Sequence, residues 1–183
     1  MIRRAGARNI SLRAGQAAAT GLEPGSVDVA MLRHVLAHNS GCEQAIVNHL
    51  ATLVRPGGTV YLADGDQVAF QILGGPGLDD MMARYMEFHR RRGNDPRIGL
   101  RLGALLEGAG LEVISFRGAY SIMTAPPGIR PPAWAAREEM LADGIIDHHA
   151  LRRWQTALTR LDTSPARPTI FAPHFTAIGR RST

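Results

Sequence analysis

Two short apolar runs flank a helical pattern in the first third of the chain. Residues 27–32 form a mostly apolar run of strand length, residues 44–53 carry apolar positions at helical spacing, and residues 59–63 form a second apolar run. This pattern predicts a strand, a helix and a strand. Such a unit pairs its two strands in parallel and lays the helix across one face of the sheet.

The turn between this helix and the second strand is well specified. Pro56 ends the helix, and the two glycines that follow it can take the positive φ angles that a tight turn requires. In doubly wound sheets, ligands bind beyond the carboxyl ends of the strands. Those ends carry Arg33, His34 and Asp64. We therefore expect a ligand site at this rim.

The rest of the chain alternates between helical and strand patterns. Further helices are predicted over residues 78–92, 96–107, 134–142 and 148–161. Further strands are predicted over residues 9–14, 111–116 and 169–178, the last of them antiparallel. The sequence has no internal repeat, so residues 1–183 are expected to form one domain, with lid segments at about 68–95 and 121–166.

Several segments resemble the middle of the class I S-adenosylmethionine-dependent methyltransferases, in order and in spacing. They are residues 9–18, 25–30, 33–38, 53–58, 96–113 and 169–179. The resemblance implies a Rossmann-like α/β fold, with a mostly parallel sheet, an antiparallel last strand and S-adenosylmethionine as cofactor. That family opens with a strand and a glycine-rich turn, and neither precedes Asn9. The fold is therefore expected to be truncated at its N-terminus.

The resemblance also implies a cofactor site. Its expected members are Gly15, Gln16 and Ala17 in the first turn, together with Arg33 at the rim. Gln16 stands where the family usually holds an aspartate that accepts a hydrogen bond from the adenine amino group. A glutamine carbonyl can accept the same bond, although without the strength of a charged acceptor. The alternative is an exposed loop glutamine with no ligand role.

His34 and His38 are the candidate catalytic residues. They are four positions apart, which on a helix places them on one face. A neutral histidine can take the proton from a hydroxyl or amine as methyl transfer proceeds. Histidines that only pack beneath the loop are the alternative. The spacing also suits a metal pair, but His34 has no neighbouring Glu and no third ligand is evident, so no metal is expected.

Four residues are expected to contact a small-molecule acceptor. Asp64 lies at the rim, Tyr85 belongs to a methionine-rich helix, and Tyr120 and Trp134 belong to the region of the second lid segment. Methionine-rich faces adapt to varied apolar partners, but core or dimer packing is the preferred interpretation of that helix.

Charge and composition narrow the function. All 21 basic residues are arginine, which excludes a lysine Schiff base and a phosphate-loop lysine. The net charge is +5, but the arginines are dispersed and have no aromatic residues interleaved, so a solvated surface is favoured over a nucleic-acid partner. No apolar run approaches the roughly 20 residues of a membrane span. Cys42 is the single cysteine, so no internal disulfide can form, and this fits a reducing compartment. We therefore expect a cytoplasmic protein.

The leading functional hypothesis is therefore methyl transfer to a small molecule. The alternative is a non-catalytic remnant of the fold that acts as an interaction module. Its exposed sheet edge would be covered by a partner or by a second copy, which makes a homodimer possible. A further hypothesis is that a longer chain, with a glycine-rich turn upstream, is the active form.

Overall fold

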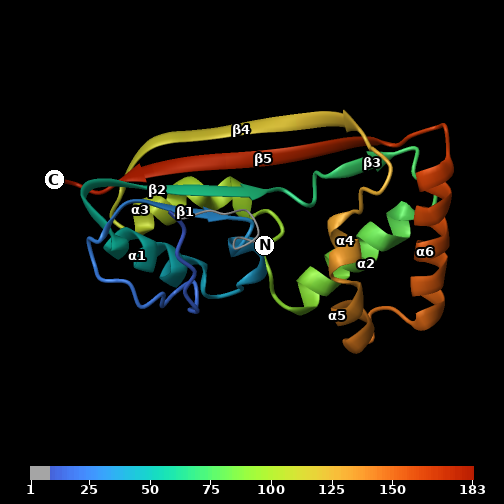
Figure 1. Ribbon diagram of the computed structural model, residues 1–183, viewed down its shortest axis with the longest axis horizontal. Helices are drawn as coiled ribbons and strands as arrows, with labels where there is room; N and C mark the ends of the chain where they lie inside the picture. The colour runs from blue at the N-terminus through green and yellow to red at the C-terminus, as the bar shows by residue number, and fades with distance from the viewer. Residues whose placement is uncertain (1–8) are drawn as a thin grey trace.

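The computed structural model describes residues 9–183. Its strands are β1 (Val27–Arg33), β2 (Val54–Gly65), β3 (Gln71–Leu73), β4 (Glu112–Thr124) and β5 (Thr169–Arg180). Its α-helices are α1 (Glu43–Leu53), α2 (Leu78–Arg91), α3 (Leu102–Gly108), α4 (Pro132–Ala135), α5 (Arg137–Ala142) and α6 (His148–Thr163). Two short 3₁₀ turns, η2 (Leu36–His38) and η3 (Ile98–Arg101), connect these elements (Figure 1).

The predicted strand–helix–strand unit is confirmed as β1, α1 and β2. The two strands run parallel, with Ala30 opposite Val60 and Leu32 opposite Leu62. Gly57 has a φ of 75°, as the turn requires. A Cβ on Gly58 would lie 2.8 Å from the carbonyl oxygen of Arg55 and 2.9 Å from that of Asp28, so only glycine fits there.

The prediction of a mostly parallel sheet is wrong. Only the β1–β2 pair is parallel among the strand pairs of the described residues, whereas β5 runs antiparallel to β2, β3 and β4. The antiparallel last strand is confirmed. β4 pairs along the whole of β5, so β2 and β3 share the opposite edge of β5, end to end. The long antiparallel pair of β4 and β5 therefore runs across both groups of helices (Figure 1).

Two separate apolar clusters stabilise the fold. The first packs β1, β2 and β5 against α1, η3 and α3, with Ile46, Leu62 and Leu106 fully buried. The second joins α2, α4, α5 and α6 around Met81 and Trp154. Burial of Met81 confirms core packing for the methionine-rich helix. The helices of the second cluster belong to the segments expected to be lids, and the expectation of one domain stays a prediction.

Most other predicted elements are present, with shifted ends. The predicted helix over 96–107 is the 3₁₀ turn η3 followed by α3, and the one over 134–142 is divided between α4 and α5. β4 extends eight residues beyond the predicted end at Phe116, and β3 was not predicted. The strand expected over residues 9–14 is wrong, because those residues adopt no regular structure. Residues 1–8, which bear on the expected truncation, lie outside the described part of the chain.

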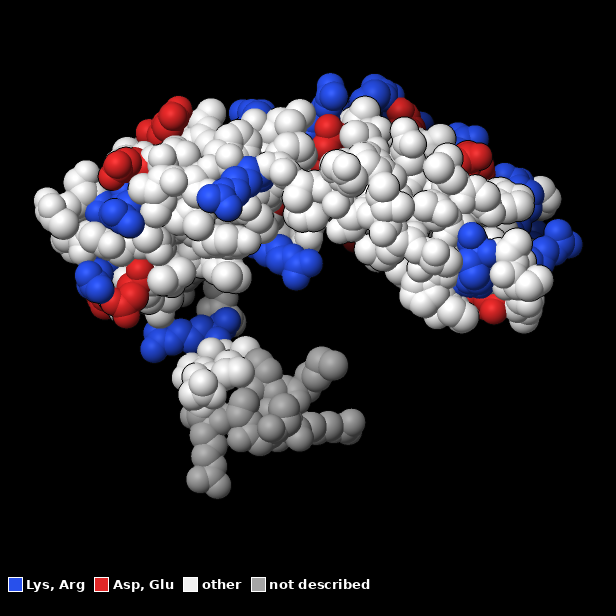
Figure 2. Space-filling view, turned by 90° about the horizontal axis from the view of Figure 1, so that it is seen from above, with Lys and Arg blue, Asp and Glu red and all other residues white. Residues whose placement is uncertain are grey.

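The surface charges are mixed in sign. On the face shown in Figure 2, arginines are scattered and lie among acidic residues. Many pairs form ion pairs, such as Arg92 with Glu139 and Asp143, at 2.6 and 2.9 Å. This arrangement supports a solvated surface. In residues 9–183, no helix has both the length and the hydropathy needed to cross a membrane.

Candidate active site

The end of β1 is strained at His34. This residue has a φ of 52°, and it is the only residue other than glycine with a positive φ in the described part of the chain. Such a backbone costs about 1 to 2 kcal/mol. The amide of His34 donates to the carbonyl oxygen of Ala63 at 3.0 Å, which holds the turn against β2. Strained residues of this kind cluster at functional sites.

Asp64 lies beside His34 at the end of β2. The His34 Nδ1 atom is 3.6 Å from the Asp64 Oδ1 atom, and the carboxylate is almost fully buried. The amide of Gly65 donates to Oδ1 at 2.9 Å. The other oxygen, Oδ2, is buried without a hydrogen-bond partner among the described residues. An unpartnered buried carboxylate oxygen is costly, so it marks a place where a donor can bind.

A second buried polar group lies on α2. His89 is 0% exposed, and neither of its ring nitrogens has a hydrogen-bond partner among the described residues. Its ring centroid lies 5.1 Å from that of His38 on η2 and 4.5 Å from that of Tyr85. Burial lowers the pKa of His89 to about 4, and the nearby His38 and Arg92 act in the same direction. His89 is therefore neutral at pH 7.

Tyr85 connects the two groups electrostatically. Burial, followed by the charges of Asp64 and Glu139, raises the pKa of its hydroxyl to about 12. The hydroxyl therefore keeps its proton and can donate a hydrogen bond at neutral pH. We call His34, His38, Asp64, Tyr85 and His89 the junction cluster, because they lie where the first apolar cluster meets the second.

The structure thus brings together four of the residues proposed from the sequence: His34, His38, Asp64 and Tyr85. Arg33 lies at the same strand end but on the other face of the sheet. It is paired with Ala63, whose neighbours along β2 point into the first apolar cluster, so alternation directs Arg33 away from that cluster. Its side chain is exposed there.

The proposed adenine turn lies on a surface segment. Gln16 and Ala19 exchange two backbone hydrogen bonds, at 3.3 and 2.9 Å, which close a turn that contains Ala17 and directly follows Gly15. The Thr20 hydroxyl lies 2.9 Å from the Nε2 atom of His49, which ties the segment to α1. Gly15 and Gln16 are exposed at a shallow groove, while Ala17 packs partly against the first apolar cluster.

The two aromatic residues proposed for the acceptor do not join the junction cluster. Tyr120 is 65% exposed on β4 and packs against Phe171, with ring centroids 5.4 Å apart. Trp134 lies on α4, where the guanidinium carbon of Arg137 is 4.8 Å from its ring centroid. Neither contact involves a residue of the junction cluster, so these contacts do not hold either aromatic side chain at the rim.

The sequence interpretation missed His89 as a functional candidate. The helical pattern placed it on the apolar face of α2, four positions after Tyr85. A histidine on such a face is usually satisfied by a nearby acceptor, and the lack of one is visible only in three dimensions. Within residues 9–183, no group of three or more His, Cys, Asp or Glu side chains could hold a metal ion.

Comparison with known structures identifies the fold. A protein from Bacillus halodurans assigned as a methyltransferase is 13% identical, with a TM-score of 0.58, and the match covers all of this chain and 76% of that one. A protein assigned as a sarcosine/dimethylglycine methyltransferase from Galdieria sulphuraria is 14% identical, with a TM-score of 0.53, over 99% of this chain and 63% of that one.

A third similar structure has a different described activity. The [4+2]-cyclase SpnF is 12% identical, with a TM-score of 0.53, over all of this chain and 61% of that one. Identities this low show the fold alone. No family model matches the sequence, and no curated protein matches it.

Proposed function

We propose that this chain, which has the class I methyltransferase fold, catalyses S-adenosylmethionine-dependent methyl transfer to a small-molecule acceptor. The observation that carries the proposal is the junction cluster. Asp64 and His89 both hold buried polar atoms that have no hydrogen-bond partner within residues 9–183. Asp64 lies at the carboxyl end of the parallel strand pair, and His89 lies on α2, against His38. Ligands bind at this position in open α/β sheets.

The residues of the rim fit part of such a cofactor. The free Oδ2 atom of Asp64 can accept a hydrogen bond from a hydroxyl or ammonium group. Gly15, Gln16 and Ala17 are the candidates for the adenine end. S-adenosylmethionine supplies, when bound, a methyl group that is already activated on a positively charged sulfur. The protein therefore has mainly to align the reactants.

Proton transfer can be assigned to the histidines of the cluster. His34 and His38 are exposed, so they can reach an acceptor and take its proton. His89 is buried and neutral, and it packs against His38. It therefore positions the His38 ring without adding a second charge. Tyr85 keeps its hydroxyl proton and can donate a hydrogen bond to the acceptor.

Calorimetry with S-adenosylmethionine and with S-adenosylhomocysteine tests the cofactor directly. We expect binding by the wild-type chain and a roughly ten- to hundredfold loss in Asp64→Asn, because a hydrogen bond to a charged group contributes about 1.5 to 3 kcal/mol. Asp28→Asn is the matched control. Asp28 is exposed and pairs with Arg55 at 2.6 Å, away from the rim. No binding at millimolar ligand would refute the proposal, and equal affinities in the two variants would remove Asp64 from the site.

We also propose that the protein acts in the cytoplasm and that no nucleic acid is its partner. The alternative of an interaction module has its own signature. It requires a partner or second copy over the exposed β1 side of the sheet, where Val29 is 55% and Met31 is 65% exposed. Sedimentation of the ligand-free chain as a dimer, together with no cofactor binding, would support that alternative and contradict the enzymatic proposal.

A further inference from the structure

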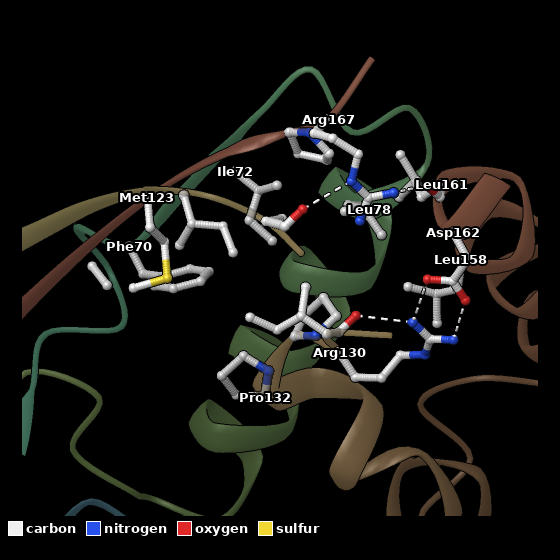
Figure 3. A pocket seen from close by; sticks show the side chains of 16 residues that line it. Phe70, Ile72, Leu78, Met123, Arg130, Pro132, Leu158, Leu161, Asp162 and Arg167 are labelled. Atoms are coloured by element: carbon white, nitrogen blue, oxygen red, sulfur yellow. Dashed lines mark hydrogen bonds and ion pairs between the residues drawn. The ribbon is translucent and has the colours of Figure 1, made fainter. Parts of the chain in front are cut away.

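An apolar cavity lies away from the junction cluster. It encloses about 200 Å³ between the start of β5, β3, the first turn of α2 and the end of α6. Phe70 and Met123 lie on one side of it, while Arg130 and Asp162 lie on the opposite side (Figure 3). Nearly all of its other lining residues are apolar.

The cavity is separate from the proposed reaction site. Asp64 is opposite Phe175 on β5, whereas the cavity reaches only as far as Ala172, which three strand residues place about 10 Å further along. On α2, the cavity touches Leu78, which lies seven residues, or about 10 Å, before Tyr85. The side chain of Met81 is fully buried within that interval.

Two of the charged side chains at the cavity, Arg130 and Asp162, form an ion pair. Arg130 pairs with Asp162 at 2.6 and 3.0 Å, and the amide of Gly128 donates to the same carboxylate at 2.8 Å. Both oxygens of Asp162 are therefore occupied. The hydrogen bonds from Arg130 and then from Gly128, together with the charges of Arg130 and Arg167, lower the pKa of Asp162 to about 2. The charges of Arg130 and Asp162 thus offset one another.

Arg167 makes no such hydrogen-bonded pair, although its charge also contributes to the lowered pKa of Asp162. Its Nε atom donates to the carbonyl oxygen of Ala125 at 2.8 Å, and its Nη1 atom donates to that of Leu161. These partners are neutral, and Arg167 forms no ion pair with a carboxylate of the described residues. A half-buried guanidinium with spare donors favours a carboxylate, which it can bind through two parallel hydrogen bonds.

We propose that this cavity binds a small apolar carboxylic acid as its anion, with the carboxylate on Arg167 and the apolar part between Phe70 and Met123. Apolar cavities of about 150 Å³ bind benzene, so the volume here suits a single ring or branched chain of about ten non-hydrogen atoms. This inference goes beyond the proposed methyl transfer, because it assigns a second ligand site that does not need the rim.

Phenylacetate and its neutral counterpart phenylacetamide are matched probes for the cavity. By calorimetry, the wild-type chain is expected to bind phenylacetate at least tenfold more tightly than phenylacetamide. Arg167→Gln should reduce that preference to about onefold, while Arg167→Lys should keep most of it. Equal affinity of the two probes for the wild-type chain, or no binding of either at millimolar concentration, would overturn the proposal.

Filling the cavity gives an independent test. Ala172 lines it, so Ala172→Leu should weaken the binding of both probes at least tenfold. Ala119→Leu, on the exposed part of β4, is the control and should bind as the wild type does. If Ala172→Leu fails to fold, an NMR titration of the wild-type chain that follows the Met123 methyl resonance takes the place of this test. That resonance should shift as phenylacetate is added, and an unchanged resonance at saturation would place the binding elsewhere and refute the assignment.

Discussion

Acidification should destabilise the protein through His89. This side chain is 0% exposed, and its pKa is lowered to about 4, mainly by burial. An unfolded chain exposes the same imidazole, whose ordinary value is about 6.5. Below pH 6.5 the unfolded state therefore binds the proton first, so the free energy of unfolding falls as the pH falls. The effect is complete near pH 4, below which both states are protonated.

The magnitude follows from the difference between the two pKa values. A difference of about 2.5 units corresponds to a total loss of about 3 kcal/mol, of which about 2 kcal/mol is lost between pH 8 and pH 5. The carboxylates with lowered pKa, including Asp162 and Glu87 at about 2, act only below about pH 4.5. Between pH 6.5 and pH 5, the change in the free energy of unfolding is therefore expected to come from histidine. After burial, the neighbouring His38 on η2 and Arg92 after α2 are the further causes of the lowered pKa of His89.

Urea unfolding at a series of pH values measures this effect, with the fluorescence of the buried Trp154 as the signal. His89→Gln removes the titration, so its stability should change little between pH 8 and pH 5, whatever its absolute value. The control is His148→Gln at the exposed start of α6, which should keep the wild-type dependence. Parallel stability curves for the wild type and His89→Gln across that range would refute a neutral, buried His89.

Two further predictions concern the turn into β2 and the closure of the cavity. Gly58→Ala should destabilise the chain by more than about 2 kcal/mol, because the new Cβ would meet two backbone oxygens. Gly57→Ala, where only the positive φ opposes the change, should cost about 1 kcal/mol in the same denaturation assay, and the reverse order would contradict the argument. Arg130→Gln should raise the pKa of Asp162 from about 2 toward 3.8 in a carboxyl-carbon NMR titration, because Arg130 is the main cause of the lowered value. Arg160→Gln, at an exposed position of α6, should leave that titration unchanged.

The strand–helix–strand unit could be predicted because several local signals agree there. Apolar runs of strand length flank a helical period. A proline and two glycines between the helical segment and the second run favour a turn there. The helix α2 was predicted for the same reason. The long antiparallel pair of β4 and β5 could not be predicted in full. Beyond Phe116, β4 is mostly exposed, and its pairing with β5 depends on backbone hydrogen bonds that leave no apolar period.

The prediction of a mostly parallel sheet was wrong because the pattern of a strand does not specify which strand it pairs with, or in which direction. The family resemblance supplied a mostly parallel sheet, whereas β5 lies between β2 and β4 and runs antiparallel to both. The same limit affected Arg33. Its place at the strand end was visible in the sequence, but the face it occupies depends on its register opposite Ala63. Only the register shows that Arg33 and Asp64 lie on different faces.

The members of the candidate site that end a strand could be placed from the topology, whereas His89, within a helix, was missed. His34 and Asp64 end the two parallel strands, so topology alone placed them together. His89 shares a helix face with Tyr85 and Phe88, and a pattern of apolar positions treats it as one more core residue. Its importance comes from the absence of a hydrogen-bond partner among the described residues, which depends on what packs against it from η2.

The junction cluster lies between two apolar clusters that are each well packed. Each unpartnered buried group at this boundary costs about 1 to 3 kcal/mol, whereas the apolar side chains on either side stabilise the fold. A ligand that hydrogen-bonds to Asp64 and His89 would remove that cost and bind the folded state selectively. Cofactor binding should accordingly slow amide exchange at the end of β2 and in the last turns of α2 more than in α1, and uniform protection would show that the ligand binds elsewhere.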